Sequence, residues 1–282
     1  MSDGKALEIV AECRQLPSLP EIYLRVKGVV DDPDGSIVDL AQAMSRDAAM
    51  TARVLRIVNS PFYGFPGRVD TVGRAVNLLG MQQVHDLVLT WAISSAFAGV
   101  NSARLSMKAF WRGSLARAIA AKRLAKNAGF VDADRLFVEG LLSNIGRLVL
   151  YVQLPELAAQ CEQRAKQSGT PCKEIERSVF GCDHAEVGAA LVHAWSLPAA
   201  FEEPIRTHLN PGQANIHATE AAILNLAAAV AERLNGGNFS AADPLAVGML
   251  SADDALLQDT ADFVDQTLEA TVAEIFPQYA TQ

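Results

Sequence analysis

Apolar residues recur along this chain at the three- and four-residue spacing of amphipathic helices. In the first hundred residues this spacing predicts helices over 6–15, 21–30, 37–45, 48–58, 72–79 and 81–97. Several predicted starts carry a side chain that can accept a hydrogen bond from the free N–H groups of a first turn, namely Ser36, Asp47 and Thr71. Gly80 separates the last two of these helices, as expected of a residue that ends a helix.

The helical spacing continues through the rest of the chain. It predicts further helices over 107–126, 132–151, 155–167, 171–179, 184–195, 198–209 and 217–234, with two or three more between 241 and 280. Asp183 and Glu186 form a capping-box pattern, because each side chain can bond a backbone N–H at the same helix start. No segment alternates apolar and polar residues as a strand does. The chain is therefore predicted to be all-α.

A gap in the pattern at 99–106 marks the boundary between two predicted subdomains. We expect a helical N-terminal subdomain over 1–100, a helical subdomain over 101–240 and a helical C-terminal tail over 241–282. A buried helix over 138–150 is expected at the centre of the second subdomain. Its apolar run contains the polar pair Ser143 and Asn144, so some feature of the fold requires polar groups there.

Composition and charge exclude several classes of protein. Half of the 282 residues are hydrophobic and a fifth are charged, which is typical of a globular chain. The net charge of −8 disfavours bulk binding to nucleic acid, since little would be gained by releasing phosphate counterions. No uncharged run approaches the ~20 residues that cross a bilayer and no signal-peptide pattern is present, so we expect a cytoplasmic protein without membrane contact. The four cysteines lack zinc-site spacing and are expected to be free thiols.

A set of short motifs occurs in a fixed order along the chain. They are LPSLP at 16–20, NSPFYG at 59–64, FWR at 110–112, GLLSNIG at 140–146, DHAEVG at 183–188, WSLP at 195–198 and HLNP at 208–211. In this order they resemble the HDOD family, the HD-related output domains of bacterial signalling proteins, over residues 16–234. The resemblance implies a helical N-terminal subdomain packed on an HD-like helical core, similar to that of HD-type metal phosphohydrolases.

The resemblance also implies where a metal centre would lie. In HD-type hydrolases, histidine nitrogens and carboxylate oxygens hold divalent metals, which generate a hydroxide and polarise the phosphoryl oxygen. Where that pattern has an adjacent His-Asp pair, this chain has Ser143 and Asn144. Gly113 stands where many relatives carry a histidine, and Ala228 stands where they often carry an aspartate. We therefore expect no bound metal, no cofactor and no catalytic residue.

The other polar residues of this vestigial site are open to more than one interpretation. His184 and His208 could contact an anion or another ligand, or they could only bond the ends of their helices. Arg147 either carries a positive charge toward the site or pairs with a carboxylate. Asn144 is expected to replace a metal bridge by hydrogen bonds, since an amide both donates and accepts.

The chain does contain one literal His-Asp pair, His85 and Asp86. It lies in the predicted N-terminal subdomain, where the resemblance places no ligands. Adjacent residues of a helix point about 100° apart, so the two seldom serve one site. We interpret this pair as a feature of the protein surface or of a helix cap.

The leading hypothesis is a non-catalytic regulatory module that acts in signal transduction through contacts with signalling proteins. No receiver or output domain is visible in the sequence, so these contacts are expected in trans, and a homodimer is left open. Two alternatives remain. One is a weak or atypical metal-dependent phosphohydrolase that uses His184 and His208, and the other is a nucleotide or phosphate sensor that uses the vestigial pocket without cleaving its ligand.

Overall fold

The computed structural model describes residues 2–13, 17–59, 63, 65–100 and 104–279. These residues form helices joined by turns, and no strand occurs among them. The prediction of an all-α fold is confirmed. Within the described ranges, every helix is too short or too polar to cross a membrane. Parts of two motifs, at 16, 60–62 and 64, lie outside the described residues.

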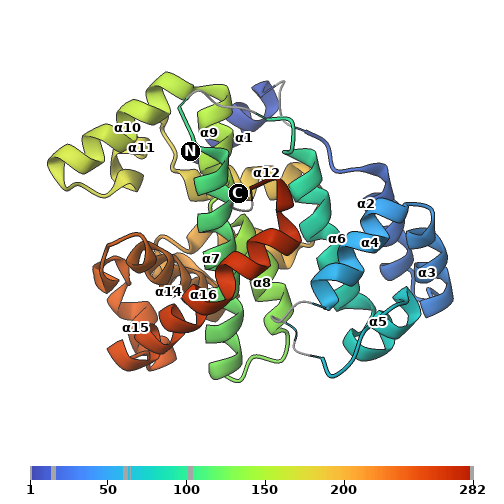
Figure 1. Cartoon of the computed structure of the whole chain (residues 1–282). Helices are drawn as coiled ribbons and strands as arrows, with labels where there is room; N and C mark the ends of the chain where they lie inside the picture. The colour runs from blue at the N-terminus through green and yellow to red at the C-terminus, as the bar shows by residue number, and fades with distance from the viewer. Residues whose placement is uncertain (1, 14–16, 60–62, 64, 101–103, 280–282) are drawn as a thin grey trace. The chain divides into compact units, whose positions relative to one another are not determined.

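The chain divides into two compact units, which can be followed by colour in Figure 1. The smaller unit comprises residues 17–99 and 266–282, and the larger unit comprises residues 1–16 and 100–265. Each unit therefore combines two segments that are far apart in the sequence. The three-part division at residues 100 and 240 stays a prediction.

Local capping defines the helix starts of the smaller unit. Its helices include α2 (Glu21–Val30), α3 (Ile37–Ser45), α4 (Ala48–Val58), α5 (Val72–Leu79) and α6 (Met81–Ala96). Ser36 Oγ accepts a hydrogen bond from the third residue of α3 at 3.2 Å, and Asp47 Oδ1 and Thr71 Oγ1 do the same for α4 and α5 at 2.8 and 3.2 Å. These caps satisfy N–H groups that a helix cannot satisfy itself, which is why the sequence located these starts to the residue.

The pair His85 and Asp86 is buried inside this unit, so its interpretation as a surface or capping feature is wrong. Both residues are 2% exposed. His85 Nδ1 lies 3.0 Å from Asp86 Oδ1, and Gln82 Nε2 donates to the same oxygen at 3.1 Å. The reason is packing: α6 is buried around most of its circumference, so its polar side chains must find partners inside the unit.

The larger unit is centred on α7 (Met107–Asn127), a long helix against which α8 (Ala133–Leu142) and α14 (Ala218–Leu234) pack (Figure 1). The N-terminal helix α1 (Ser2–Glu12) packs on α12 (His184–Ala194) of this unit and begins four residues earlier than predicted. The other elements are α9 (Ile145–Gln153), α10 (Pro155–Ser168), α11 (Cys172–Phe180), α12 (His184–Ala194), α13 (Ala199–Thr207), η1 (Pro211–Gln213), η2 (Phe239–Ala241) and α15 (Pro244–Leu250). The last long helix, α16 (Asp254–Ile275), begins in the larger unit and ends in the smaller one, which also contains η3 (Pro277–Tyr279).

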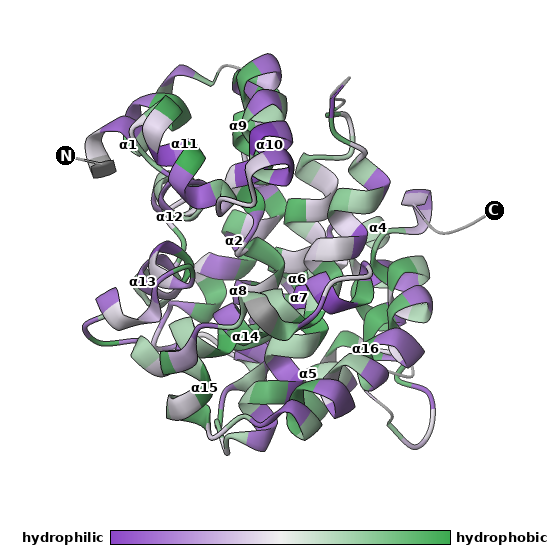
Figure 2. Cartoon of the chain, turned by 90° about the vertical axis from the view of Figure 1, so that its left-hand side faces the viewer, coloured by the Kyte–Doolittle hydropathy of each residue, from purple (hydrophilic) through white to green (hydrophobic). Residues whose placement is uncertain are grey.

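The helices of the larger unit differ in hydropathy (Figure 2). In α14, most residues between 220 and 231 are buried. In contrast, α10 is largely hydrophilic, and its buried residues are Ala158 and Cys161. The polar face of α10 is therefore available to line a site.

The predicted continuous helix over 132–151 is wrong, because the chain breaks at its polar pair. Ser143 caps the end of α8, and Asn144 precedes the first residue of α9. Ser143 Oγ donates to Gly140 O at 2.8 Å, which gives the backbone a local alternative to continuing the helix. Gly146 then brings the α9 backbone against α12, where an added Cβ would stand only 1.9 Å from His184 O. The helix break and the close approach of α9 to α12 together bring Asn144 to the same cavity as His184, the first residue of α12.

Candidate functional site

His184 is the first residue of α12, and the capping box predicted there is present. Asp183 Oδ1 accepts from Glu186 N at 3.1 Å, while Glu186 Oε2 accepts from Asp183 N at 2.8 Å. His184 is 7% exposed, and its Nδ1 lies 2.6 Å from Glu176 Oε2 on α11. Glu176 thereby orients the imidazole and leaves Nε2 on the opposite side of the ring.

Glu176 is a site residue that sequence reasoning missed. It is 4% exposed, and its Oε2 also accepts from His184 N at 3.1 Å. Burial by itself raises the pKa of Glu176, but the charge of His184 and the two hydrogen bonds outweigh burial and hold that pKa below its usual value. Nothing in the sequence marked this glutamate, because its partner lies eight residues away on another helix.

His208 is completely buried at the end of α13. Its Nδ1 donates to Ile205 O at 2.7 Å, while its Nε2 has no hydrogen-bond partner. Burial, together with the nearby charges of His184, Arg117 and Lys173, lowers the pKa of His208 to about 3, so the imidazole is neutral near pH 7. The ring centroids of His184 and His208 are 6.2 Å apart. The structure thus brings the two histidines together.

The other four positions of the vestigial site differ in their burial and in whether they line a cavity. Asn144 is 7% exposed, and its Oδ1 has no hydrogen-bond partner among the described residues. The expectation that its amide replaces a metal bridge stays a prediction. Ser143 is fully buried and bonds the backbone. Ala228 lines a cavity together with Asn144, whereas Gly113 on α7 is not among the residues that line it.

Arg147 fits both interpretations offered from the sequence, because it pairs with a carboxylate and also lines the site. Its Nη2 donates to Glu162 Oε2 at 2.9 Å, and the Tyr151 hydroxyl donates to the same oxygen at 2.5 Å. Burial raises the pKa of Glu162, but hydrogen bonds from Lys166 and Tyr151 and the charge of Arg147 hold it at about 2. Arg147 is therefore an ion-paired residue that also lines the cavity.

The cavity has a volume of about 670 Å³ and lies entirely within the larger unit. Its polar lining includes Arg117, Asn144, Arg147, Glu162, His184 and Asn225. Asn225 Nδ2 donates to His208 O at 2.9 Å, and Asn225 Oδ1 accepts from Asp243 N at 2.8 Å, so this amide is satisfied by the backbone. The groups left for a ligand therefore come from the other polar residues of the lining.

Arg117 on α7 is a second residue that sequence reasoning missed. It lines the cavity, is 9% exposed, and its Nη1 has no hydrogen-bond partner. One signal could have found it: Arg117 follows Gly113 by four residues, and such residues share a helix face. The arginine also interrupts an alanine-rich stretch, where a charge requires an explanation.

Comparison with known proteins identifies the family. The model of the HDOD domain matches residues 16–211. The chain belongs to the HDOD family. A candidate phosphohydrolase from Shewanella amazonensis SB2B has a similar structure, with a TM-score of 0.74, 25% identity and coverage of 96% of this chain and 98% of that chain. An HDOD domain protein with unknown function from Geobacter sulfurreducens has a TM-score of 0.72 and 25% identity, and the match covers 99% of this chain and 97% of that chain.

One curated relative of this HDOD chain is longer than the chain itself. An uncharacterized protein of Treponema pallidum (strain Nichols) is 27% identical over 207 residues. The match covers 73% of this chain and 40% of the relative. The likeness therefore concerns less than half of that protein.

The HD-like core of this HDOD protein raises the question of whether a metal ion fits the site. His184 and His208 keep one feature of ligating imidazoles, since the Nδ1 of each contacts an oxygen atom and Nε2 faces away from it. At the position where the resemblance implies a His-Asp pair, however, the chain has Ser143 and Asn144, and neither side chain is a carboxylate. Among the described residues, no group of three or more His, Cys, Asp or Glu side chains is placed to hold a metal. The residues present therefore do not fit the metal centre of an HD hydrolase.

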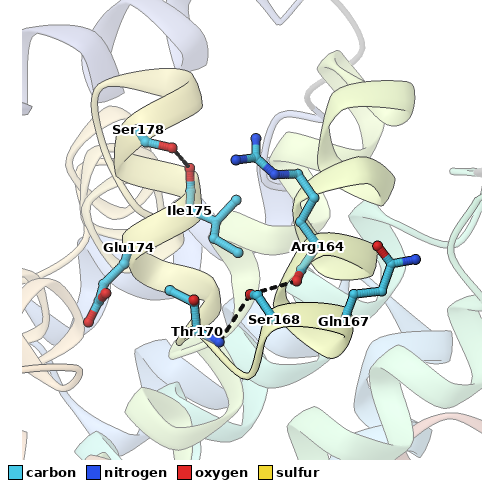
Figure 3. Close-up of a pocket in the computed structure, with 7 residues that line it drawn as sticks. All are labelled: Arg164, Gln167, Ser168, Thr170, Glu174, Ile175 and Ser178. Carbon is cyan, nitrogen blue, oxygen red and sulfur yellow. Dashed lines mark hydrogen bonds between the residues drawn. The ribbon is translucent and has the colours of Figure 1, made fainter.

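A second hollow, of about 500 Å³, lies between α10 and α11 (Figure 3). Its serine hydroxyls bond the backbone: Ser168 Oγ donates to Arg164 O, and Ser178 Oγ donates to Ile175 O, both at 2.8 Å. Its charged residues, Arg164 and Glu174, are exposed, so water competes with any ligand. We therefore regard the cavity around Arg117 and His184 as the candidate site of this HDOD protein.

Proposed function

We propose that this HDOD protein is a non-catalytic module of bacterial signal transduction that acts in trans through contacts with other proteins. The observation that supports this proposal is the set of groups at the former His-Asp position. There, Ser143 bonds the backbone, Asn144 offers only a neutral amide, and neither supplies a carboxylate. A hydrolase of the HD type needs charged oxygen ligands to hold the ion that activates water. Without charged oxygen ligands, we expect the protein to retain a surface for contacts with other proteins and to lack hydrolase activity.

The alternative is a metal-dependent phosphohydrolase, which the name of the Shewanella relative suggests. In this alternative, His184, His208 and supplementary ligands would hold a divalent ion. Neutral imidazoles suit softer ions such as Zn²⁺ or Ni²⁺ better than Mg²⁺ or Mn²⁺. The test must therefore include ions of both kinds.

The first experiment measures metal content and turnover of the purified full chain. The protein is loaded separately with Mn²⁺, Fe²⁺, Ni²⁺ and Zn²⁺, and hydrolysis of bis(p-nitrophenyl) phosphate is followed. We expect substoichiometric metal and a rate equal to that of a His184→Ala/His208→Ala variant. A stoichiometric ion with turnover that this double variant lacks would refute the proposal. A Ser143→His/Asn144→Asp/Ala228→Asp variant reports whether returning the missing ligands restores metal binding.

The second experiment concerns the partner. The tagged full chain is cross-linked in cells of its native host, and co-purifying proteins are identified by mass spectrometry. We expect one signalling protein to be enriched equally by the wild type and by the His184→Ala/His208→Ala variant, since the proposed contacts do not use these imidazoles. Enrichment no greater than that of an unrelated tagged protein would count against contacts in trans.

A further inference from the structure

Arg117 is a buried cation whose hydrogen-bonding capacity is not used. It is 9% exposed, and its Nη1 is shielded from solvent without an acceptor. Burial lowers the pKa of Arg117 to about 10, so the guanidinium still carries its charge near pH 7. Glu232 on α14 acts on this charge through space, yet Arg117 Nη1 has no hydrogen-bond partner among the described residues. A buried guanidinium with five donors is unfavourable unless an acceptor satisfies it.

The cavity that Arg117 lines has an excess of positive charge. Its wall carries four basic residues and two carboxylates: Arg117, Arg147, Lys166, Lys173, Glu162 and Glu232. Glu162 is already shared, because it accepts from both Arg147 and Lys166 at 2.9 and 2.7 Å. Lys173 Nζ bonds uncharged oxygens, Leu209 O at 2.6 Å and Asn210 Oδ1 at 2.7 Å. The charges of Arg117 and Lys173 are thus left without a hydrogen-bonded carboxylate.

Glu176, a buried carboxylate outside the cavity wall, acts on the charge of Arg147 but forms no hydrogen bond with Arg117 or Lys173. Glu176 directs Oε2 at both the Nδ1 and the backbone N–H of His184. Its charge is therefore used to hold one imidazole and the first turn of α12. A cation entering the cavity would meet repulsion from Arg117, whereas an anion would meet attraction.

We propose that this cavity binds a small phosphorylated molecule through its phosphate group, with Arg117 as the main contact. A guanidinium presents parallel N–H donors that match two oxygens of a phosphate, and such bonds are strongest where water is excluded. The cavity, at about 670 Å³, is within the range of small-molecule sites, roughly 300–1,000 Å³. That volume exceeds what a phosphate ion fills, which favours a molecule of about nucleotide size over the free ion. The inference goes beyond the proposed function, because contacts with a partner need no ligand in this cavity.

The test is calorimetric titration of the full chain in buffer that contains EDTA and no phosphate. The probes are adenosine 5′-monophosphate, inorganic phosphate and adenosine. Arg117→Met removes the charge and keeps most of the apolar stem, and Arg164→Met is a matched control at an exposed arginine in the hollow of Figure 3. We expect the nucleotide to bind the wild type and the control equally. For Arg117→Met, its affinity should fall roughly tenfold to hundredfold, the contribution of charged hydrogen bonds.

The folding of the variant is checked by urea denaturation without ligand. Arg117→Met should be at least as stable as the wild type, because it removes a buried charge without a hydrogen-bonded partner. Should this variant unfold, Lys173→Met takes its place and is expected to lower nucleotide affinity as well. If inorganic phosphate binds more weakly than the nucleotide, the result supports a phosphorylated molecule, and not the free ion, as the ligand.

Four outcomes would overturn the inference. They are no binding of either phosphate-bearing probe, equal nucleotide affinity in Arg117→Met, adenosine binding as tightly as its monophosphate, and binding of inorganic phosphate as tight as that of the nucleotide. Cleavage of the nucleotide in a parallel incubation with Mn²⁺ or Ni²⁺ and without EDTA would instead refute the proposed function and leave this inference standing. The two proposals can therefore fail separately.

Discussion

His184 and His208 stand 6.2 Å apart but are held by different partners. A buried carboxylate holds His184, while a backbone carbonyl holds His208. Burial beside positive charges favours the neutral form of the His208 imidazole. The low pKa of His208 follows from its surroundings and has a measurable consequence for stability.

Replacing His208 should change how stability depends on pH. Below its usual pKa of 6.5, His208 takes up a proton in the unfolded chain, but the folded chain resists protonation until about pH 3. Stability is therefore lost as pH falls from 6.5 towards 3, at up to about 1.4 kcal/mol per pH unit. A His208→Gln variant should lose about 2 kcal/mol less than the wild type between pH 7 and pH 5, measured by urea denaturation.

The control for this prediction is His193→Gln, since the His193 side chain is 67% exposed. This variant reports how much of any change comes from replacing an exposed imidazole and not from removing a buried one. If His208→Gln follows the wild type, burial does not hold the His208 imidazole neutral, and the low pKa of this residue is wrong.

At the scale of elements, the site depends on the break between α8 and α9 and on the contact of α9 with α12. Ser143 ends one helix by bonding backward to Gly140, and the next helix starts two residues later. Gly146 has no side chain, so the two helix backbones meet directly at His184 O. This contact places Asn144 and His184 on the wall of one cavity.

Gly146→Ala should therefore separate α9 from α12. Its Cβ would stand 1.9 Å from His184 O and 2.6 Å from Gly188 N, which are backbone atoms that cannot rotate away. We expect a loss of about 3 kcal/mol or more in the free energy of unfolding. Gly113→Ala is the matched control on α7, where an added Cβ meets nothing within 4 Å, and it should stabilise the chain by roughly 0.5–1 kcal/mol. Equal effects of the two substitutions would contradict this packing.

At the scale of the whole molecule, sequence neighbours do not always share a unit. Residues 1–16 belong with residues 100–265, although residues 17–99 lie between them in the chain. The N-terminal helix α1 packs on α12, where Ala6 and Val10 are buried. The same larger unit contains both histidines, Glu176 and Arg117, so the complete candidate site belongs to one unit.

Removing residues 1–16 should consequently destabilise the larger unit. The deletion exposes the face of α12 that Ala6 and Val10 cover, at an expected cost of about 3 kcal/mol in urea denaturation. Within α1, Val10→Ala should cost about 1–2 kcal/mol. Leu7→Ala at a 47% exposed position should change stability by less than about 0.5 kcal/mol. A truncated chain as stable as the intact one would show that α1 contributes nothing to the unit.

The sequence by itself determined the features that depend on near neighbours. Periodic apolar positions predicted the all-α fold, and caps such as Ser36, Asp47 and Asp183 located helix starts, because their hydrogen bonds close within three residues. The ordered motifs identified the family, while the loss of metal ligands at Ser143 and Asn144 stays a prediction. None of these inferences required knowing which distant segments meet.

Only the tertiary structure decided which polar groups meet and which are buried. Glu176 became part of the site because α11 packs near the start of α12, and Arg117 did so because a cavity opens between helices that are distant in sequence. His85 and Asp86 likewise lie in the interior, although the sequence led us to expect this pair at the surface or in a helix cap. The physical reason is that solvation and charge depend on distances through space, and a one-dimensional pattern records only distances along the chain.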